Sequence, residues 1–535
     1  MYLIDQHTKK IMEECKERAR AAGLSFNDET LEYIVTNRDM INLGPKNMIP
    51  TLYDYWVHDV EVLKEQGKYK LYPHNPYETV INSRPAISFY NDNNPDWLNI
   101  MIFYHVLAHI DFFQNNILFE NTWKDDFVGL ALADKRLIEN LRSEHGRWVD
   151  YVIEFSRSID NITGYFKGLP KRQQAGVKQS SKLNFYFEVF LQKIIKAPQH
   201  QIFKEIDRYN NIGQVNSEMT ESVFFSDVRV RYPEFQAKFD NYVSEEPESA
   251  DIMDFICRHS AFLKKEENRW MQSVITIIRN TSLYFAPQIR TKIMNEGWAS
   301  YWHDELFRKD KRIKGHEVDF ARVNAGVTAI SRVGLNPYAI GMRLIQHVEE
   351  LADKGRINYN FQKLDDSTIR ENYNKKTGNG KETIFSLRKN FSDFMLLNTF
   401  VDQDFINKHD LFVVGKRANE EKGVYEYYIK SKKAEDYKNM MLDSLYHPPL
   451  IKVDTKKTTE DNLYLTHLFE GKQIYKPYIP DTLLGLEYLW GGQVQLETTE
   501  VVREENTSDE ENNSNFSYRK VLYTMKNKKI EKTTL

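Results

Sequence analysis

The chain of 535 residues has few cysteines, no long apolar run and almost no net charge. Its two cysteines, Cys15 and Cys257, can build neither a disulfide framework nor a cysteine-based zinc site, which favours a reducing compartment. No window approaches the ~18 consecutive apolar residues of a membrane span, and the first ten residues lack the apolar core of a signal peptide. The formal charge of -4 provides no general basic field for binding nucleic acid. We therefore expect a cytoplasmic protein without a nucleic-acid partner.

Aromatic and apolar patterning predicts a mainly α fold with a large core. Aromatic residues make up 13% of the chain and hydrophobic residues 41%, which is enough for thick, well-packed interiors. The length exceeds the ~100–200 residues of one usual domain. Capping residues and apolar spacing predict helices over 6–22, from the Ser25–Glu29 cap through Val35, and over 96–116, 126–162, 184–195, 250–278 and 284–307.

Three kinds of segment interrupt the helical pattern. Residues 77–90 are β-branched and aromatic, which predicts a short extended pair. Residues 361–384 are polar and favour a linker, and strand-like runs beyond it predict a smaller α+β module over 385–502. The end, 503–535, has few apolar residues, so we expect a flexible tail whose removal leaves the melting temperature almost unchanged. A large helical domain over 1–360 would precede these parts.

His105 and His109 stand four residues apart in the apolar run 96–116, so both imidazoles share one face of the expected helix. This spacing is typical of metal ligands, although many such pairs are hydrogen-bonded core histidines. Burying two polar rings among apolar residues costs a few kcal/mol each unless they find partners. One shared cation is an efficient partner for both.

The helix over 284–307 carries Glu296 and His303 seven residues apart, on nearly one face. Small residues between them leave room for a neighbouring helix. Their separation of about 10.5 Å along the axis favours one ligand plus one supporting or catalytic group. His105, His109 and Glu296 would then form a ligand set with an open position, which suits zinc first and iron or manganese as well. The alternative is a buried Glu–His pair that only braces two helices.

A general base is not evident from the motifs. In the zinc-peptidase motif His-Glu-x-x-His the base follows the first histidine, but Val106 occupies that position. Glu78, on the extended segment, is one candidate, and the alternative for it is a solvated or cap-bonded glutamate. Asp111 is near in sequence, but six residues past His105 it lies on a different side of the helix.

Several blocks of the sequence together carry a family resemblance. They are Tyr77-Glu78 with Asn82-Ser83 and Pro85, His105-x-x-x-His109, Tyr284-Phe285-x-Pro287-Gln288, Asn295-Glu296-Gly297-Trp298-Ala299 with Trp302-His303, Asn336-Pro337-Tyr338, and Leu489-Trp490-Gly491. In this order they resemble the stage V sporulation protein R (SpoVR) family. The resemblance implies a cytoplasmic bacterial protein, linked in spore formers to spore-cortex formation and found also in bacteria that make no spores.

The resemblance also implies partners and site residues. A PrkA-type serine kinase and a von Willebrand-like protein are the expected partners in a sporulation or stress-response pathway. The family's histidines and glutamate map onto His105, His109, Glu296 and His303. A further histidine of the family is missing from the matching stretch 323–327, unless His316 substitutes for it.

The leading hypothesis is a metal-dependent hydrolase of the peptidase or amidase type. His105, His109 and Glu296 would hold zinc, and His303 or Glu78 would polarise water or stabilise the oxyanion. The family's cell-wall link makes peptidoglycan precursors or peptides the expected substrates. The alternative is a non-enzymatic regulatory or scaffold protein of the kinase-linked pathway. A non-haem iron oxygenase shares the ligand types but has no other support.

Overall fold

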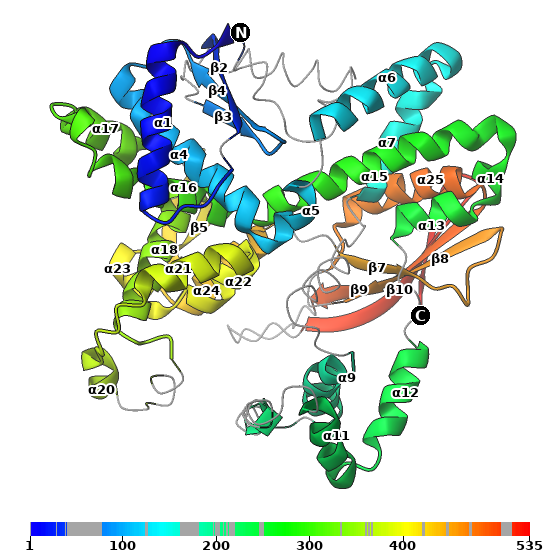
Figure 1. Ribbon diagram of the computed structural model, residues 1–535. Helices are drawn as coiled ribbons and strands as arrows, with labels where there is room; N and C mark the ends of the chain where they lie inside the picture. The colour runs from blue at the N-terminus through cyan, green and yellow to red at the C-terminus, as the bar shows by residue number, and fades with distance from the viewer. Residues whose placement is uncertain are drawn as a thin grey trace. The chain divides into compact units, whose positions relative to one another are not determined.

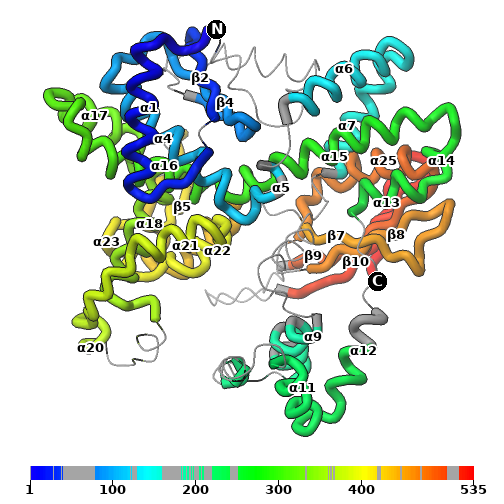
Figure 2. The backbone as a smooth tube through the Cα atoms, in the orientation of Figure 1, coloured from blue at the N-terminus to red at the C-terminus, as the bar shows by residue number. Residues whose placement is uncertain are grey.

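The computed structural model describes residues 2–27, 29–37, 78–123, 127–160, 181–195, 220–245, 251–331, 334–358, 367–419, 423–445, 449–469, 473–503 and 516–535, with a few single positions between them (Figure 1). The chain divides into two compact units. Unit 1 comprises Met1–Arg157 and Trp270–His447, and unit 2 comprises Ser158–Arg269 and Pro448–Leu535. Each unit therefore combines segments that are distant in sequence, as the colour order in Figure 2 shows.

Unit 1 begins with helix α1 (Gln6–Ala21), as predicted, and a four-stranded sheet. The strand order is β1-β2-β4-β3, and the strands are β1 Tyr2–Leu3, β2 Thr30–Val35, β3 Glu78–Ile81 and β4 Ala86–Asn91. The two inner strands, β2 and β4, are parallel, and each outer strand is antiparallel to its inner neighbour. The extended pair expected over 77–90 is confirmed. The helix expected through Val35 is wrong, because the β-branched and aromatic residues of β2 pair with β4 instead.

A helix that is buried nearly all round, α4 (Asp96–Asn115), lies at the centre of unit 1. It packs against α1 and α16 (Lys292–Phe307), and α16 packs in turn against α18 (Pro337–Asp353). Helices α16 and α18 cross where Gly297 meets Gly341. A methyl group added at Gly341 would lie 2.0 Å from the carbonyl oxygen of Ile293, so only glycine permits this approach. The crossing holds α16 between α4 and α18.

The remaining elements of unit 1 are mostly helices, and α7 and α15 each run across a boundary between the units. They are α5 Glu120–Trp123, α6 Phe127–His145, α7 Trp148–Asp160, α15 Arg269–Arg290, α17 Glu317–Val327, α20 Ser367–Asn372, α21 Gly380–Asn390, α22 Asp393–Phe400, α23 Gln403–His409, α24 Ala434–Ser444 and the hairpin of β5 Val413–Asn419 with β6 Val424–Ser431. The helix expected over 126–162 is interrupted where Gly146 adopts a φ of 58°. Glycine favours this left-handed conformation.

The segment 361–384 is not a linker between two domains. The main-chain N–H of Thr377 donates to the carbonyl oxygen of Asp353 (2.8 Å), and that of Gly380 donates to its carboxylate (2.7 Å). Helix α21 follows at once and packs on α18. The polar residues therefore form a turn against the end of α18, and helices α21 to α24 belong to unit 1 instead of to a C-terminal module.

Unit 2 contains the larger sheet of the protein, in the order β11-β10-β9-β8-β7. Its strands are β7 Leu450–Val453, β8 Asn462–Leu468, β9 Gln493–Arg503, β10 Phe516–Lys526 and β11 Lys529–Thr534. Strands β8 and β9 are parallel and are joined through α25 (Ile479–Trp490), which packs on the sheet. The described helices of this unit also include α9 Ser181–Asn184, a π-helix over Phe185–Ile194, α11 Thr220–Arg231, α12 Phe235–Glu245, α13 Ile252–His259 and α14 Ala261–Lys264.

The prediction of a flexible tail over 503–535 is wrong for residues 516–535, which form β10 and β11. Val521, Tyr523 and Met525 alternate along β10 and are buried. The Tyr523 hydroxyl and the Lys532 ammonium both bind the Glu500 carboxylate of β9. Few apolar residues are needed here, because a strand buries only every second side chain on a one-sided sheet.

The fold class is confirmed as mainly α, with a short sheet in the helical unit and a smaller α+β part. In the part of the chain that the structure describes, no helix is long and apolar enough to cross a lipid bilayer. The site residues predicted on helices all lie in unit 1.

Candidate metal centre

Two adjacent helices bring the predicted residues together. Helix α4 contributes His105 and His109, and α16 contributes Glu296 and His303. The Nε2 atoms of His105 and His109 are 3.1 Å apart, and a carboxylate oxygen of Glu296, Oε2, lies 3.5 Å from His109 Nε2. One potential ligand atom from each of these three residues lies within 4.8 Å of the others. The predicted side-by-side packing of the two helices is confirmed.

Two of the distances between these three atoms suit a transition metal. Zinc–nitrogen distances of ~2.0–2.1 Å place neighbouring ligand atoms of a tetrahedral site about 3.3 Å apart. The distances of 3.1 and 3.5 Å lie on either side of that value. Glu296 Oε2 is buried and accepts no hydrogen bond from any described residue. Since a buried carboxylate oxygen is costly without a positive charge or a donor, the donor set fits a cation.

His303 lies behind His105, on the side away from His109. Its Nδ1 is 2.8 Å from His105 Nδ1, and its Nε2 is 2.9 Å from Oδ1 of Asn324. The orientation of the Asn324 amide is set by Asp304, because Asn324 Nδ2 donates to that carboxylate (2.9 Å). His303 Nε2 therefore carries the ring proton, and His303 Nδ1 accepts from the Nδ1–H of His105.

The proton on His109 is assigned by its own amide partner. His109 Nδ1 lies 2.9 Å from Oδ1 of Asn295, so in this orientation Nδ1 is the donor. With Nδ1 protonated on both ligand rings, the Nε2 lone pairs of His105 and His109 face each other beside Glu296 Oε2. Acceptor atoms that face one another repel, and one divalent cation satisfies all three. Metal-binding histidines usually make such a second hydrogen bond from the other ring nitrogen.

Protonation of His105 or His303 does not supply this positive charge at neutral pH. Burial lowers the pKa of His105 well below its usual range, and neighbouring His109 and His303 lower it further. Burial also lowers the pKa of His303 to about 4, against the opposing effect of its hydrogen bond to Asn324. His105 and His303 are therefore neutral at pH 7, and neutral imidazole is the form that binds metal.

The first turn of α16 is held by Asp393 of α22. The Asp393 carboxylate accepts hydrogen bonds from the main-chain N–H groups of Ile293 and Met294, both at 2.8 Å. Burial raises the pKa of Asp393 to about 7; the two hydrogen bonds oppose this rise, and the charge of Glu296 adds to it. A carboxylate at a helix N-terminus satisfies donors that the helix leaves unpaired. Asp393 thereby helps to place Glu296.

The two other acids considered from the sequence lie on different elements or faces. Glu78 begins β3, with its main chain opposite Tyr90 of β4. Its side chain lies outside what the structure describes, so its role as a base stays a prediction. Asp111 accepts a hydrogen bond from the indole N–H of Trp298 (2.8 Å). Its other oxygen accepts from the main-chain N–H of Ser25 (2.7 Å), so both of its oxygens are bound by residues outside the candidate ligand set.

Two amides at the site were missed from the sequence. Asn295 lies eight residues before His303, on the same face of α16, and this spacing could have indicated it. Asn324 lies on α17, and no spacing in the sequence relates it to α4 or α16. His316 does not substitute for the missing family histidine, because its ring stacks on Trp97 with 5.6 Å between centroids. Asn324 holds the position beside His303 instead.

The fold and this site define a mainly helical protein with a candidate metal centre between two central helices. The chain belongs to the family described as SpoVR like protein, whose family model matches residues 5–447, and the resemblance inferred from the motifs is confirmed. It is 24% identical over 335 residues to "Uncharacterized protein YcgB" of Escherichia coli (strain K12), and the match covers 59% of this chain and 59% of that protein. No solved structure matches the chain.

Proposed function

We propose that the chain is a metal-dependent hydrolase of the peptidase or amidase type, with zinc held by His105, His109 and Glu296. The observation that carries the proposal is the convergence of His105 Nε2, His109 Nε2 and the buried Glu296 Oε2. Three protein ligands leave one position for water, whereas structural zinc sites are closed by four. Zinc bound there would lower the pKa of that water to about 7 and polarise a substrate carbonyl. Iron or manganese would suit the same ligands.

His303 acts in this proposal as a positioning residue. It is 1% exposed and bonds to His105 on the side away from His109, so substrate does not reach it. It holds the tautomer and the ring plane of His105, as Asn295 does for His109. Glu78 remains the proposed group that takes a proton from water or stabilises the oxyanion.

The substrate, partners and location are proposed from family membership. Peptides or peptidoglycan precursors are the proposed substrates, because the family is linked to formation of the spore cortex. A PrkA-type serine kinase and a von Willebrand-like protein are the proposed partners. The cytoplasm is the proposed location, which agrees with two cysteines that are both free.

A regulatory or scaffold role in the same pathway is the second candidate. The observation that favours it is burial, since His105 and His109 are each 5% exposed. In that case the metal would join α4 to α16 without exchanging its water for substrate. The two functions differ in whether the fourth position of the metal accepts an added ligand.

Elemental analysis of protein purified without chelators tests the metal centre. We expect about one equivalent of a divalent transition metal, and His109→Ala should lose most of it because two protein ligands hold zinc weakly. His303→Ala should retain a site with about 10–100-fold lower affinity. His316→Ala, which changes an exposed histidine outside the site, is the matched control. Parent protein that contains no metal and takes up no zinc, iron or manganese on dialysis would contradict the proposal.

Cobalt substitution then separates the two functions. Cobalt in an open site changes its visible spectrum when a small anion or a hydroxamate is added, and the same compound should inhibit peptide or amide hydrolysis. A spectrum that does not respond, together with no hydrolysis, would favour the scaffold.

A further inference from the structure

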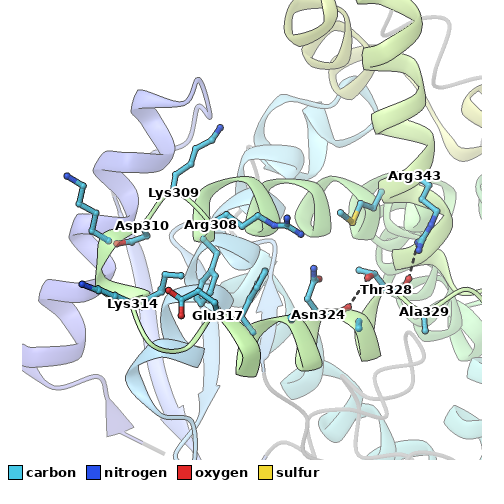
Figure 3. A pocket seen from close by; sticks show the side chains of 16 residues that line it. Arg308, Lys309, Asp310, Lys314, Glu317, Asn324, Thr328, Ala329 and Arg343 are labelled. Carbon is cyan, nitrogen blue, oxygen red and sulfur yellow. Dashed lines mark hydrogen bonds between the residues drawn. The ribbon is translucent and has the colours of Figure 1, made fainter.

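A groove of about 960 Å³ lies between the end of α16, the 3-10 turn at Lys311–Ile313, α17 and α18 (Figure 3). Asn324, whose amide holds His303, forms part of its wall. Since His303 Nδ1 faces His105 and its Nε2 faces Asn324, the groove lies on the other side of His303 from the ligand atoms. It is therefore separate from the candidate metal centre.

The floor of the groove is apolar. Phe320 and Met342 line it, and Phe307, itself fully buried, stacks on Phe320 with 4.1 Å between ring centroids. The polar side chains in the wall are already hydrogen-bonded: Asn324 to His303 and Asp304, and the Thr328 hydroxyl to the carbonyl oxygen of Asn324 (2.8 Å). A peptide or a sugar would lose its own hydrogen bonds to water against such a floor. An alkyl chain would lose none.

The ends of the groove are positively charged. Lys311 and Lys314 lie at one end, with the carboxylate of Glu317 beside them, and Arg343 lies at the other. Figure 3 shows Lys314 and Arg343 on opposite sides of Asn324. Among the described residues, none of these three cations has a carboxylate within 4.0 Å. The other two cations of the lining are neutralised, Arg308 by Asp304 and Lys309 by Glu305.

Arg343 is the best placed of the three cations to hold an anionic group. Its Nη1 donates to the main-chain carbonyl oxygens of Thr328 and Ala339, both at 2.9 Å, which fixes the guanidinium. Among the described residues, no hydrogen-bond acceptor is recorded for its other nitrogens, which leaves them for a ligand. A guanidinium held in this way matches the two oxygens of a carboxylate or phosphate.

We propose that this groove binds a single-chain amphiphilic anion, with its carboxylate or phosphate head on Arg343 and its alkyl chain over Phe320 and Met342. Lys311 and Lys314 at the far end attract the anion without contacting its head. The volume is within the range of small-molecule pockets, and an apolar floor with few directed polar groups is typical of them.

Isothermal titration calorimetry of the full chain with dodecanoate, below its critical micelle concentration, tests the proposal. We expect one saturable site per chain, no measurable binding of acetate, and at least about tenfold weaker binding of dodecyltrimethylammonium, which has the same chain and the opposite charge. Dodecyl phosphate in place of dodecanoate decides which head group is preferred. The titrations are run on both zinc-loaded and chelator-treated protein, so that their outcome does not depend on the metal centre.

Two variants locate the binding site. Arg343→Gln should weaken dodecanoate binding about tenfold, which corresponds to the free energy of one charged hydrogen bond. Ala325→Trp should abolish it, because Ala325 is exposed in the groove and an indole there would fill the space above the floor. Arg322→Gln removes the same charge from α17 outside the lining and should change nothing. Thermal melting of each variant shows whether it is folded.

Three results would overturn the proposal. They are equal affinity for dodecanoate and dodecyltrimethylammonium, dodecanoate binding that Ala325→Trp leaves unchanged, and binding only to phosphatidylglycerol vesicles with none to the monomeric anion. The last result would assign the charged rim to a membrane surface. If Arg343→Gln does not fold, Ala325→Trp decides the question alone.

Discussion

Replacement of Glu296 by glutamine separates a metal ligand from a structural ion pair. Glu296→Gln keeps the shape of the side chain and removes its charge. Without metal, the Glu296 Oε2 atom is buried and accepts no hydrogen bond from the described residues. Removing that charge should therefore leave the stability of metal-free protein unchanged or raise it. With metal, the same change removes the one anionic ligand and weakens binding.

The expected size follows from mass action. Zinc at 100 times the parent Kd stabilises the folded protein by about 2.7 kcal/mol. If the variant binds zinc about 100-fold more weakly, the same concentration equals its Kd and contributes about 0.4 kcal/mol. One kcal/mol shifts the Tm of a domain of 150–250 residues by about 2–4 °C, and unit 1 is larger, so we use the lower figure. Zinc should raise the Tm by about 5 °C in the parent and about 1 °C in the variant.

Differential scanning calorimetry of chelator-stripped protein, with and without zinc, measures both effects. Glu305→Gln is the control, because it removes the same charge from α16 at a partly exposed site paired with Lys309. It should keep the full zinc response. A structural His109–Glu296 pair would behave in the opposite way: Glu296→Gln would destabilise metal-free protein by a kcal/mol or more, and zinc would shift neither Tm. That result would refute the argument from three converging acceptors.

The remaining predictions concern packing and the C-terminal strands. Gly341→Ala should destabilise unit 1 by about 3 kcal/mol or more in urea unfolding, because its methyl group would meet the main chain of Ile293. The control is Gly326→Ala on α17, which has open space around it and should be neutral or slightly stabilising. Truncation after Val502 should lower the melting temperature of unit 2 substantially, because it removes the buried side chains of Val521, Tyr523 and Met525 on β10. Burial of each contributes about 1.5–3 kcal/mol to stability. An unchanged melting temperature would support the flexible tail predicted from the sequence. Burial tends to raise the pKa of Glu500, but its bonds to Lys532, Tyr523 and Lys476 outweigh this and lower it to about 2. Because that folded-state pKa lies below the ordinary 4.5, the stabilisation from this group is complete above pH 4.5 and is lost as the pH falls through 2. Glu500→Gln removes this contribution, so the stability of the variant should fall less steeply in acid, by at most about 3 kcal/mol.

The sequence by itself determined the features that depend on neighbours along the chain. The position of α4 followed from the apolar residues over 96–116, and the shared face of His105 and His109 followed from helical spacing. The same reasoning indicated that Glu296 and His303 would take different places relative to one ion. Contacts between residues three, four or seven positions apart are set by the helix itself, so they can be derived without the tertiary fold.

The tertiary structure alone decided which distant segments meet. It placed Asn324 beside His303 and Asp393 under the first turn of α16, and it showed residues 516–535 as strands and not as a tail. Over 503–535 the sequence carries a polar or weakly apolar stretch whose local pattern indicates a flexible tail. Such a stretch becomes ordered because a partner from elsewhere in the chain supplies its hydrogen bonds or covers one face. That partner is selected by the packing of the whole unit, and no local spacing encodes it.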